Sequence, residues 1–360
     1  MLFVTNRTLK QSHRSRKDRP VDFVHNDNRV SQSVFFCERF AVETLKSPSS
    51  VTSAQYLEIG GEAFFKRLKN TKAEQILLYI HGVNSLPEPH VFSQSMQLQM
   101  LFERHAKGLV QVVPLIWPCA RDSGIVREFW DDQQAAEASA AAFARMISMF
   151  MVWRENEQQR SAPCSKRINM LAHSMGGRVL MRSMDGWAEF NNIHRVPILF
   201  RNTFLMAPDI SNDALEAERA GRRICESSRN VSIYYSGDDL MMLPASTGPK
   251  GASFGNRVLS RRLGQTGPED MDRVPKNVFS LDCDDFSRLS DPDYGHRYFL
   301  EMNPGVPTPA FEHMLNALKT GRPYPRERSA ILSEGQPRSA IDVQRVTEHY
   351  HTPKKAMSTK

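Results

Sequence analysis

Short apolar runs, separated by stretches with helical spacing, constrain the fold of this chain most. The runs at 76–80 and 168–172 end at His81-Gly82 and His173-Ser174, and such short runs suit central strands of a parallel sheet. Further strands are expected at 34–37, 56–59, 109–117, 202–207, 231–235 and 277–282. Helices are expected at 62–69, 91–105, 132–155, from the segment at 173–177 to about 187, at 212–226, near 255–263 and at 309–319. This alternation predicts an α/β fold with a doubly wound, mostly parallel sheet and helices on both faces.

One strand carries an irregularity. Pro114 interrupts the run at 109–117. Because proline lacks the N–H that a ladder uses, a bulge or bend is expected there.

The charge distribution suggests where the folded domain begins and ends. The net charge is +7 and the pI about 9.2, which would suit nucleic acid or a membrane surface. The basic residues gather at 10–19 and in the tail, however, and such blocks are usually solvated and disordered. We therefore expect a flexible basic segment at 1–30, a domain at 31–324, a disordered tail at 325–360, and no nucleic-acid partner.

Cysteine spacing and hydropathy bear on the compartment. The five cysteines are far apart and form no CxxC pair, so no disulfide framework is expected and a reducing, cytoplasmic location is favoured. The N-terminus lacks the apolar region of a secretory signal. Charged and small residues interrupt the stretch at 135–153, which indicates a buried or amphipathic helix and no transmembrane segment.

The segment Ala172-His173-Ser174-Met175-Gly176 has the form of a nucleophile elbow. In that motif a sharp strand-to-helix turn presents a serine, and small residues two positions before and after it let the backbones pass. Ala172 replaces the more common glycine and is still small. Ser174 is therefore the candidate nucleophile, although a chance S-x-G after a strand is the structural alternative.

Two backbone N–H groups are candidates for an oxyanion hole. One belongs to Met175, directly after the serine, and the other to Val83, in the loop that follows the strand at 76–80. Gly82 would let that loop approach a substrate closely. His81 is expected to pin the loop and not to transfer protons.

The acid and the base should follow later strands. Asp238 and Asp239 follow the strand at 231–235, and either could orient a histidine. Asp209 is a third candidate, with helix capping as its favoured role. His296 follows the last strand, so the order serine, aspartate, histidine is that of the hydrolase motif. The aspartates of 282–293 could instead suggest a metal site, but they lack calcium-loop spacing, and a solvated loop is expected.

Five motifs together resemble the bacterial alpha/beta hydrolases of unknown function. They are the segments at 79–84, 116–118, 171–176, 207–209 and 295–299, and the resemblance covers roughly 30–320. It implies the alpha/beta-hydrolase fold and a serine triad. In that family the acid follows a Y-x-S-x-x-D pattern, which fits 234–239 if Asp239 is the acid. Arg297 departs from the serine that commonly follows the histidine, and it alters the charge expected in the pocket.

These residues predict a serine hydrolase that cleaves a small-molecule or lipid acyl ester with Ser174, His296 and Asp239, and without a metal ion or other cofactor. Three alternatives remain: an acyltransferase on the same triad, a non-catalytic binding protein with a hydrolase fold, and an anion- or membrane-binding role led by the basic ends. Segments 119–131 and 240–270 are candidate lids.

Overall fold

The computed structural model describes residues 1–10, 19–40, 55–121, 125–242, 261–323 and 328–333. The strands of the main sheet are β1 (Leu2–Arg7), β2 (Arg19–Val21), β3 (Val30–Phe40), β4 (Gln55–Glu58), β5 (Gln75–Ile80), β6 (Val110–Ile116), β7 (Arg167–His173), β8 (Phe200–Met206), β9 (Ser228–Tyr235), β10 (Val278–Asp282) and β13 (Ser329–Ile331). A separate hairpin pairs β11 (Glu301–Asn303) with β12 (Val306–Pro307).

The helices of the described residues cover the sheet. They are α1 (Gly61–Asn70), α2 (Ser93–His105), α3 (Ile125–Glu155), α4 (Glu157–Ser161), α5 (Gly176–Phe190), α6 (Arg222–Glu226), α8 (Leu263–Thr266), α9 (Asp284–Ser290) and α10 (Pro309–Thr320). The π-helical turn η1 (Pro87–Phe92) leads into α2, and the 3-10 turn η2 (Leu240–Met242) follows β9.

The main sheet is doubly wound. Its strand order is β13-β10-β9-β8-β7-β5-β6-β1-β3-β4-β2. Neighbours from β13 to β1 run parallel, whereas β3, β4 and β2 add antiparallel pairs at one side. This confirms the predicted mostly parallel α/β sheet.

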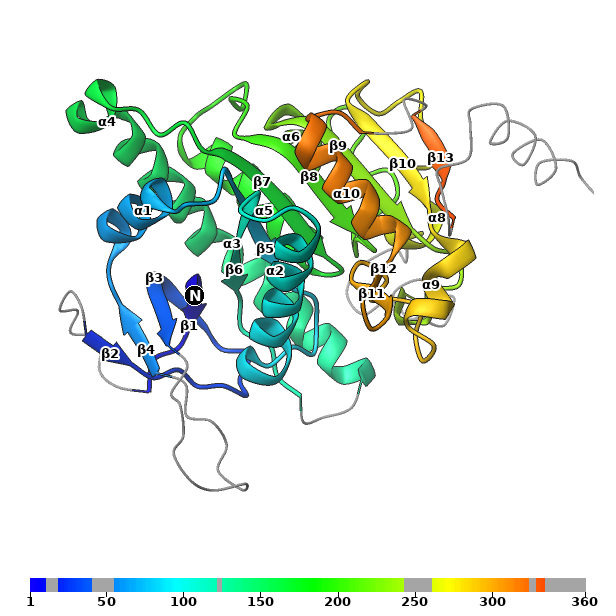
Figure 1. The fold of residues 1–360 in the computed structure, drawn as a ribbon, viewed down its shortest axis with the longest axis horizontal. Coiled ribbons are helices and arrows are strands. Elements are labelled where there is room, and N and C mark those ends of the chain that lie inside the picture. The colour runs from blue at the N-terminus through cyan, green and yellow to red at the C-terminus, as the bar shows by residue number, and fades with distance from the viewer. Residues whose placement is uncertain (11–18, 41–54, 122–124, 243–260, 324–327, 334–360) are drawn as a thin grey trace, which may run out of the picture.

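Helices cover both faces of the sheet, as Figure 1 shows. Side chains of α1, α3 and α5 share one buried cluster, and those of α2, α9 and α10 share the other. Successive residues of β5 alternate between them: Ile76 and Ile80 join the first cluster, and Leu77 and Tyr79 join the second. A central strand is apolar at consecutive positions because both of its faces are covered.

The ends of the chain differ from the expectation of flexible flanks. β1 lies inside the sheet, parallel to β6 and antiparallel to β3, and Phe3 and Val4 are buried. β13 extends the other side through parallel pairing with β10. The domain limits of 31 and 324 were therefore wrong, because apolar residues of both flanks complete the sheet. Residues 11–18 and 334–360 lie outside the described residues.

Two local predictions were wrong. β6 pairs with β5 in unbroken register through Tyr79↔Pro114, so no bulge forms; the ladder with β1 begins only at Leu115. Of the helix expected at 212–226, only α6 is helical. The preceding chain folds back in turns, and a Cβ at Gly221 would lie 2.5 Å from the Ala214 carbonyl oxygen.

The acidic stretch at 282–293 is not a solvated loop. Asp284 and Asp285 begin α9, and Asp284 accepts hydrogen bonds from Ser236 and from the backbone of Gly237. Residues 255–260 of the helix-like stretch near 255–263 and parts of both candidate lids are not described, and α8 begins only at Leu263.

Helix α3 is long and apolar enough, from Phe129 to Glu155, to cross a membrane by length and composition alone. Half of its apolar window is buried inside the protein, where it packs against α5 and β3. This packing agrees with the expected buried helix.

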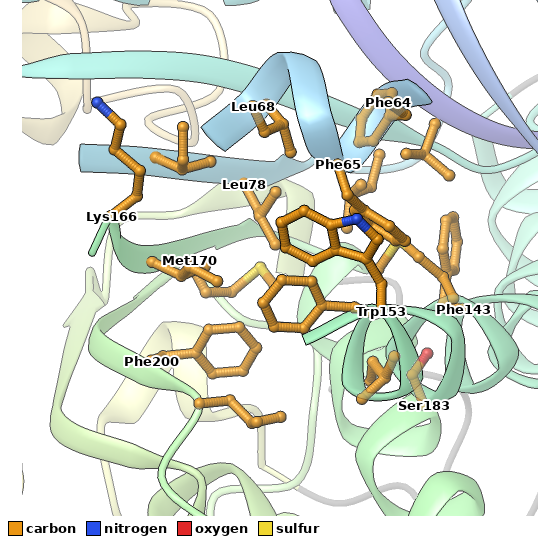
Figure 2. Close-up of a pocket in the computed structure, with 18 of the residues that line it drawn as sticks. Phe64, Phe65, Leu68, Leu78, Phe143, Trp153, Lys166, Met170, Ser183 and Phe200 are labelled. Atoms are coloured by element: carbon orange, nitrogen blue, oxygen red, sulfur yellow. The ribbon is translucent and has the colours of Figure 1, made fainter. Parts of the chain in front are cut away.

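An apolar cavity of about 80 Å³ lies between this helix layer and the sheet. Figure 2 shows Phe65, Phe143 and Trp153 on one side and Met170 and Phe200 on the other. Its exposed surface is almost entirely apolar, although Lys69, Cys164, Lys166 and Ser183 are among the lining residues.

Candidate active site

The loops after β5 and β7 lie side by side at the carboxyl edge of the sheet. The two strands pair in parallel from Gln75↔Arg167 to Ile80↔Ala172. β6 lies on the other side of β5, so the winding direction of the chain reverses between these loops. Open α/β sheets bind their ligands at such a switch point.

Ser174 occupies the turn between β7 and α5 with a φ of 54°. A side-chain-bearing residue rarely adopts this conformation, which is costly unless its surroundings hold it. Here its N–H donates to the Met206 carbonyl at 2.8 Å, and its carbonyl accepts from the N–H groups of Gly177 and Asp209 at 3.0 Å each. The surrounding backbone therefore fixes the turn.

Two glycines let the neighbouring backbones meet at this turn. A Cβ at Gly176 would lie 2.5 Å from the Ile80 carbonyl oxygen and 2.7 Å from that of His81. A Cβ at Gly82 would lie 2.8 Å from the Ser174 Cβ and 3.3 Å from its Oγ. The loop after β5 thus passes directly beside the Ser174 side chain.

The predicted oxyanion donors flank this contact. Val83 follows Gly82 and lines a pocket, while Met175 lies at the N-terminal end of α5, where the helix dipole favours negative charge. Between described residues, we find no protein acceptor for either N–H.

His81 is a structural residue. Its ring stacks on Trp117 with 5.1 Å between ring centroids. The backbone N–H of Trp117 donates to His81 Nε2 at 3.2 Å, and His81 Nδ1 lies 2.8 Å from the Gly82 carbonyl oxygen. Burial lowers the pKa of His81 to about 3, so the ring is neutral. These contacts agree with the expected role of pinning the loop.

Asp239 and His296 form a buried pair. Asp239 Oδ2 lies 2.6 Å from His296 Nδ1, and its Oδ1 accepts the Met241 N–H at 2.9 Å. Asp239 is fully buried, whereas Asp238 is exposed and its backbone N–H donates to Ser236. The geometry therefore favours Asp239 over Asp238 as the partner of His296.

Asp209 has a different role from the helix cap that was expected. No helix begins directly after it. Its buried carboxylate instead lies 3.1 Å from Arg262 Nε and 3.7 Å from Arg178 Nη2. Asp209 is thus an ion-pair partner beneath the elbow and does not contact His296.

Three further residues support the site in roles that the sequence did not suggest. One Asp291 oxygen accepts the backbone N–H groups of His296 and Arg297 at 3.0 Å each. His173 packs against the His296 ring at 4.7 Å between centroids, and its Nε2 lies 3.3 Å from the His296 carbonyl oxygen. Burial lowers the pKa of His173 well below its ordinary value, and the charge of His296 is a second, smaller cause.

Asp132 of α3 is the third of these residues. Its two oxygens accept the backbone N–H groups of Asn84, at 3.0 Å, and Ala120, at 3.2 Å. Asn84 has a φ of 54° and follows Val83, so this carboxylate fixes the predicted oxyanion loop. Burial raises the pKa of Asp132 to about 6.

Ser174 and His296 come to the same edge of the sheet without a direct hydrogen bond between their described atoms. His173, which precedes the serine, bridges them through its contact with the His296 ring. In hydrolases, hydrogen bonds between catalytic side chains are often long without substrate and tighten when it binds.

A pocket of about 120 Å³ opens beside these residues. Its lining includes Gly82, Val83, His173 and His296, together with His90, Arg121 and Arg297. A larger groove of about 430 Å³ shares His90, Gln94, Asp291 and Arg297 with it. A ligand in the pocket can therefore extend into the groove past His90 and Arg297. Among the described residues, no three His, Cys, Asp or Glu side chains are grouped to hold a metal ion.

Residues 60–306 match the family described as alpha/beta hydrolase of unknown function (DUF900). This match confirms the resemblance inferred from the five motifs. No curated protein matches the chain.

Several solved structures are similar. The phospholipase PlaB from Legionella pneumophila in complex with thio-NAD is 15% identical, with a TM-score of 0.23, over 58% of this chain and 38% of that chain. A structure of the metagenome-derived lipolytic enzymes LipS and LipT is 10% identical, with a TM-score of 0.26, over 78% of this chain and 93% of that chain. A lipase-esterase related protein from Clostridium acetobutylicum is 11% identical, with a TM-score of 0.23, over 78% of this chain and 95% of that chain.

Proposed function

Because the chain belongs to the family of alpha/beta hydrolases of unknown function, we propose that it is a serine hydrolase that cleaves an ester or related acyl bond. The observation that carries the proposal is the conformation of Ser174. It is held at a φ of 54° at the switch point of the sheet, and the Asp239–His296 pair reaches the same edge. Backbone strain of this kind is typical of functional sites.

In the proposed mechanism, Ser174 Oγ attacks the acyl carbonyl while His296 Nε2 takes its proton. His296 then returns the proton to the leaving group, and water releases the acyl group in the reverse sequence. Asp239, bound to Nδ1 at 2.6 Å, fixes the tautomer that leaves Nε2 free to accept, and it stabilises the imidazolium.

The N–H groups of Val83 and Met175 would stabilise the oxyanion. Removing one such donor typically costs about 10²–10³-fold in rate. In this scheme, Asp132 and His81 act indirectly because they fix the loop that carries Val83. Asp291 and His173 likewise position His296.

The proposed substrate is a small-molecule or lipid acyl ester that occupies the pocket and the adjoining groove. We also propose a cytoplasmic location, which is supported by the five free cysteines, since disulfides are rare in reducing compartments.

Labelling with a fluorophosphonate probe tests the proposal, because the probe reacts with activated serines. We expect the wild type to be labelled at Ser174, and Ser174→Ala and His296→Ala to lose labelling. Ser183→Ala is the matched control, since Ser183 lies further along α5 and lines the apolar cavity (Figure 2). A wild type that stays unlabelled would contradict the proposal and favour a non-catalytic binding protein, whereas labelling at another serine would reject Ser174 as the nucleophile.

A further inference from the structure

The pocket beside Ser174 is rich in positive charge. Arg121 and Arg297 both line it, and Asp291 is the acidic residue of its described lining. The Asp291 carboxylate already accepts two backbone N–H groups, and it lies 3.9 Å from Arg297 Nε. The guanidinium of Arg297 is about half exposed, at 47% of its side chain. The positive charge of the pocket is therefore incompletely balanced by the described side chains.

His90 shows how these cations are arranged. Its Nδ1 accepts the Leu86 N–H at 3.0 Å, and its Nε2 lies 2.7 Å from Arg121 Nη1. A neutral imidazole has one donor and one acceptor nitrogen. Since Leu86 and Arg121 both present donors, whichever tautomer forms places two N–H donors against each other at one of the contacts.

An anion would relieve this conflict. With Nδ1 accepting from Leu86, Nε2–H and the Arg121 guanidinium both offer hydrogens at the same place, and an oxygen anion could accept from both. Burial lowers the pKa of His90, and the nearby positive charges of Arg121 and Arg297 lower it further. Charge-assisted hydrogen bonds of this kind are the strong ones.

The position of the cluster indicates which part of a ligand it would bind. His90 and Arg297 line both the pocket and the groove, so they stand where the two meet. A ligand that occupied both the pocket and the groove would pass this junction. Glu301 also lines the groove, but it is paired with Arg104 at 2.7 Å.

We propose that Arg121, His90 and Arg297 form a binding site for an anionic group, so that the substrate is an ester bearing a phosphate or carboxylate. The claim that the bound molecule is a substrate rests on the proposed hydrolase function, whereas the claim that the site binds an anion does not. Binding measurements can therefore test it separately from catalysis.

The direct test is calorimetric titration of the purified full chain with phenyl phosphate and benzoate, with benzyl alcohol as the neutral comparison. We expect both anions to bind, and Arg121→Gln and Arg297→Gln each to weaken binding by about 10-fold or more, as expected for loss of a charge-assisted contact. Arg297→Lys should retain part of the affinity, because it keeps the charge. Arg195→Gln is the control, at an exposed position before β8 at the opposite edge of the sheet.

The kinetic test compares two matched esters, p-nitrophenyl hemisuccinate and its methyl ester. We expect the wild type to prefer the anionic ester in kcat/KM, and Arg297→Gln to reduce the ratio of the two constants about 10-fold. Equal binding of benzyl alcohol and the anions, or a ratio unaffected by both arginine substitutions, would overturn the anion site. Anion binding without fluorophosphonate labelling would leave the site standing and reject only the hydrolase.

A competition experiment tests whether the anionic group belongs to a soluble ester or to a lipid headgroup. Displacement of phenyl phosphate by sn-glycerol 3-phosphate would point to a soluble ester. Displacement only by phosphatidylcholine vesicles that contain phosphatidic acid would point to a lipid headgroup. Either result supports the proposed site, and displacement by pure phosphatidylcholine vesicles to the same extent would contradict it.

Discussion

Adjacent aspartates after β9 differ in their surroundings, and this difference yields a test at the residue scale. Asp239 is fully buried against His296, whereas Asp238 is exposed. Replacing the orienting carboxylate of a triad by an amide favours the wrong histidine tautomer and lowers kcat by about 10⁴-fold. We expect Asp239→Asn to show a loss of this order in ester hydrolysis.

Asp238→Asn is the matched control for that substitution and should change kcat less than about 3-fold, since surface substitutions are usually mild. If Asp238→Asn lost as much activity as Asp239→Asn, the assignment of the acid would be wrong.

Residues next to a motif could be predicted from the sequence better than residues that support it from a distance. Ser174 and His296 follow recognisable strands, and the family pattern selected Asp239. Asp132 could not be found in this way, because nothing in its helical pattern marks it and it meets Asn84 only through the packing of α3. Arg297 was noticed only as a departure from the family, and His90 was not singled out, because their contacts join separate loops.

At the scale of elements, the start of α5 depends on the close approach of β5. A Cβ at Gly176 would collide with two backbone carbonyl oxygens, at 2.5 and 2.7 Å, and backbone atoms cannot move aside as a flexible side chain can. We expect Gly176→Ala to lower the free energy of unfolding by about 1–3 kcal/mol or more and to slow labelling of Ser174. Urea unfolding and labelling rates measure the two effects.

The same helix provides the matched control. At Gly186, no atom lies within 4 Å of the place that a Cβ would occupy, and alanine is favoured over glycine inside a helix by roughly 0.5–1 kcal/mol. Gly186→Ala should therefore stabilise the protein slightly. Equal effects of the two substitutions would show that the packing at the elbow is not what restricts position 176.

The elements themselves were predictable where their pattern was strong. The central strands β5, β7 and β9 are apolar on both faces and were found, as were α2, α3 and α10. The pairing of β1 was missed because six residues at a chain end carry little periodicity, and their place in the sheet depends on β6, more than 100 residues later in the sequence. The turns before α6 were mistaken for helix because helical spacing does not register Gly221 pressed against a carbonyl.

At the scale of the whole molecule, buried histidines make stability depend on pH. Burial lowers the pKa values of His81 and His313 to about 3 and that of His173 well below its ordinary value. The unfolded chain therefore binds more protons than the native state below about pH 6.5, and stability falls as the pH drops. Between about pH 3 and 6.5, each such histidine lowers the free energy of unfolding by about 1.4 kcal/mol for each pH unit of acidification.

Asp132 and Asp282 oppose this trend, because burial raises the folded pKa of each from 3.8 to about 6. Their protonation stabilises the native state below about pH 4, and this stability is lost as the pH rises through 6. The three histidines outnumber these two carboxyl groups, so we expect net destabilisation from pH 7 to 5 in urea unfolding. His313→Gln should reduce the slope, with the exposed His194→Gln as control; a flat profile would contradict the expectation.

The apolar cavity between the helix layer of α3 and the sheet also affects the volume of the folded protein. Its volume of about 80 Å³ corresponds to about 50 mL per mole, comparable with the decrease of about 20–100 mL per mole that accompanies unfolding of typical proteins. Because water fills such voids when the chain unfolds, hydrostatic pressure favours the unfolded state. The layer between α3 and the sheet is therefore one place where compression is expected to disturb the packing.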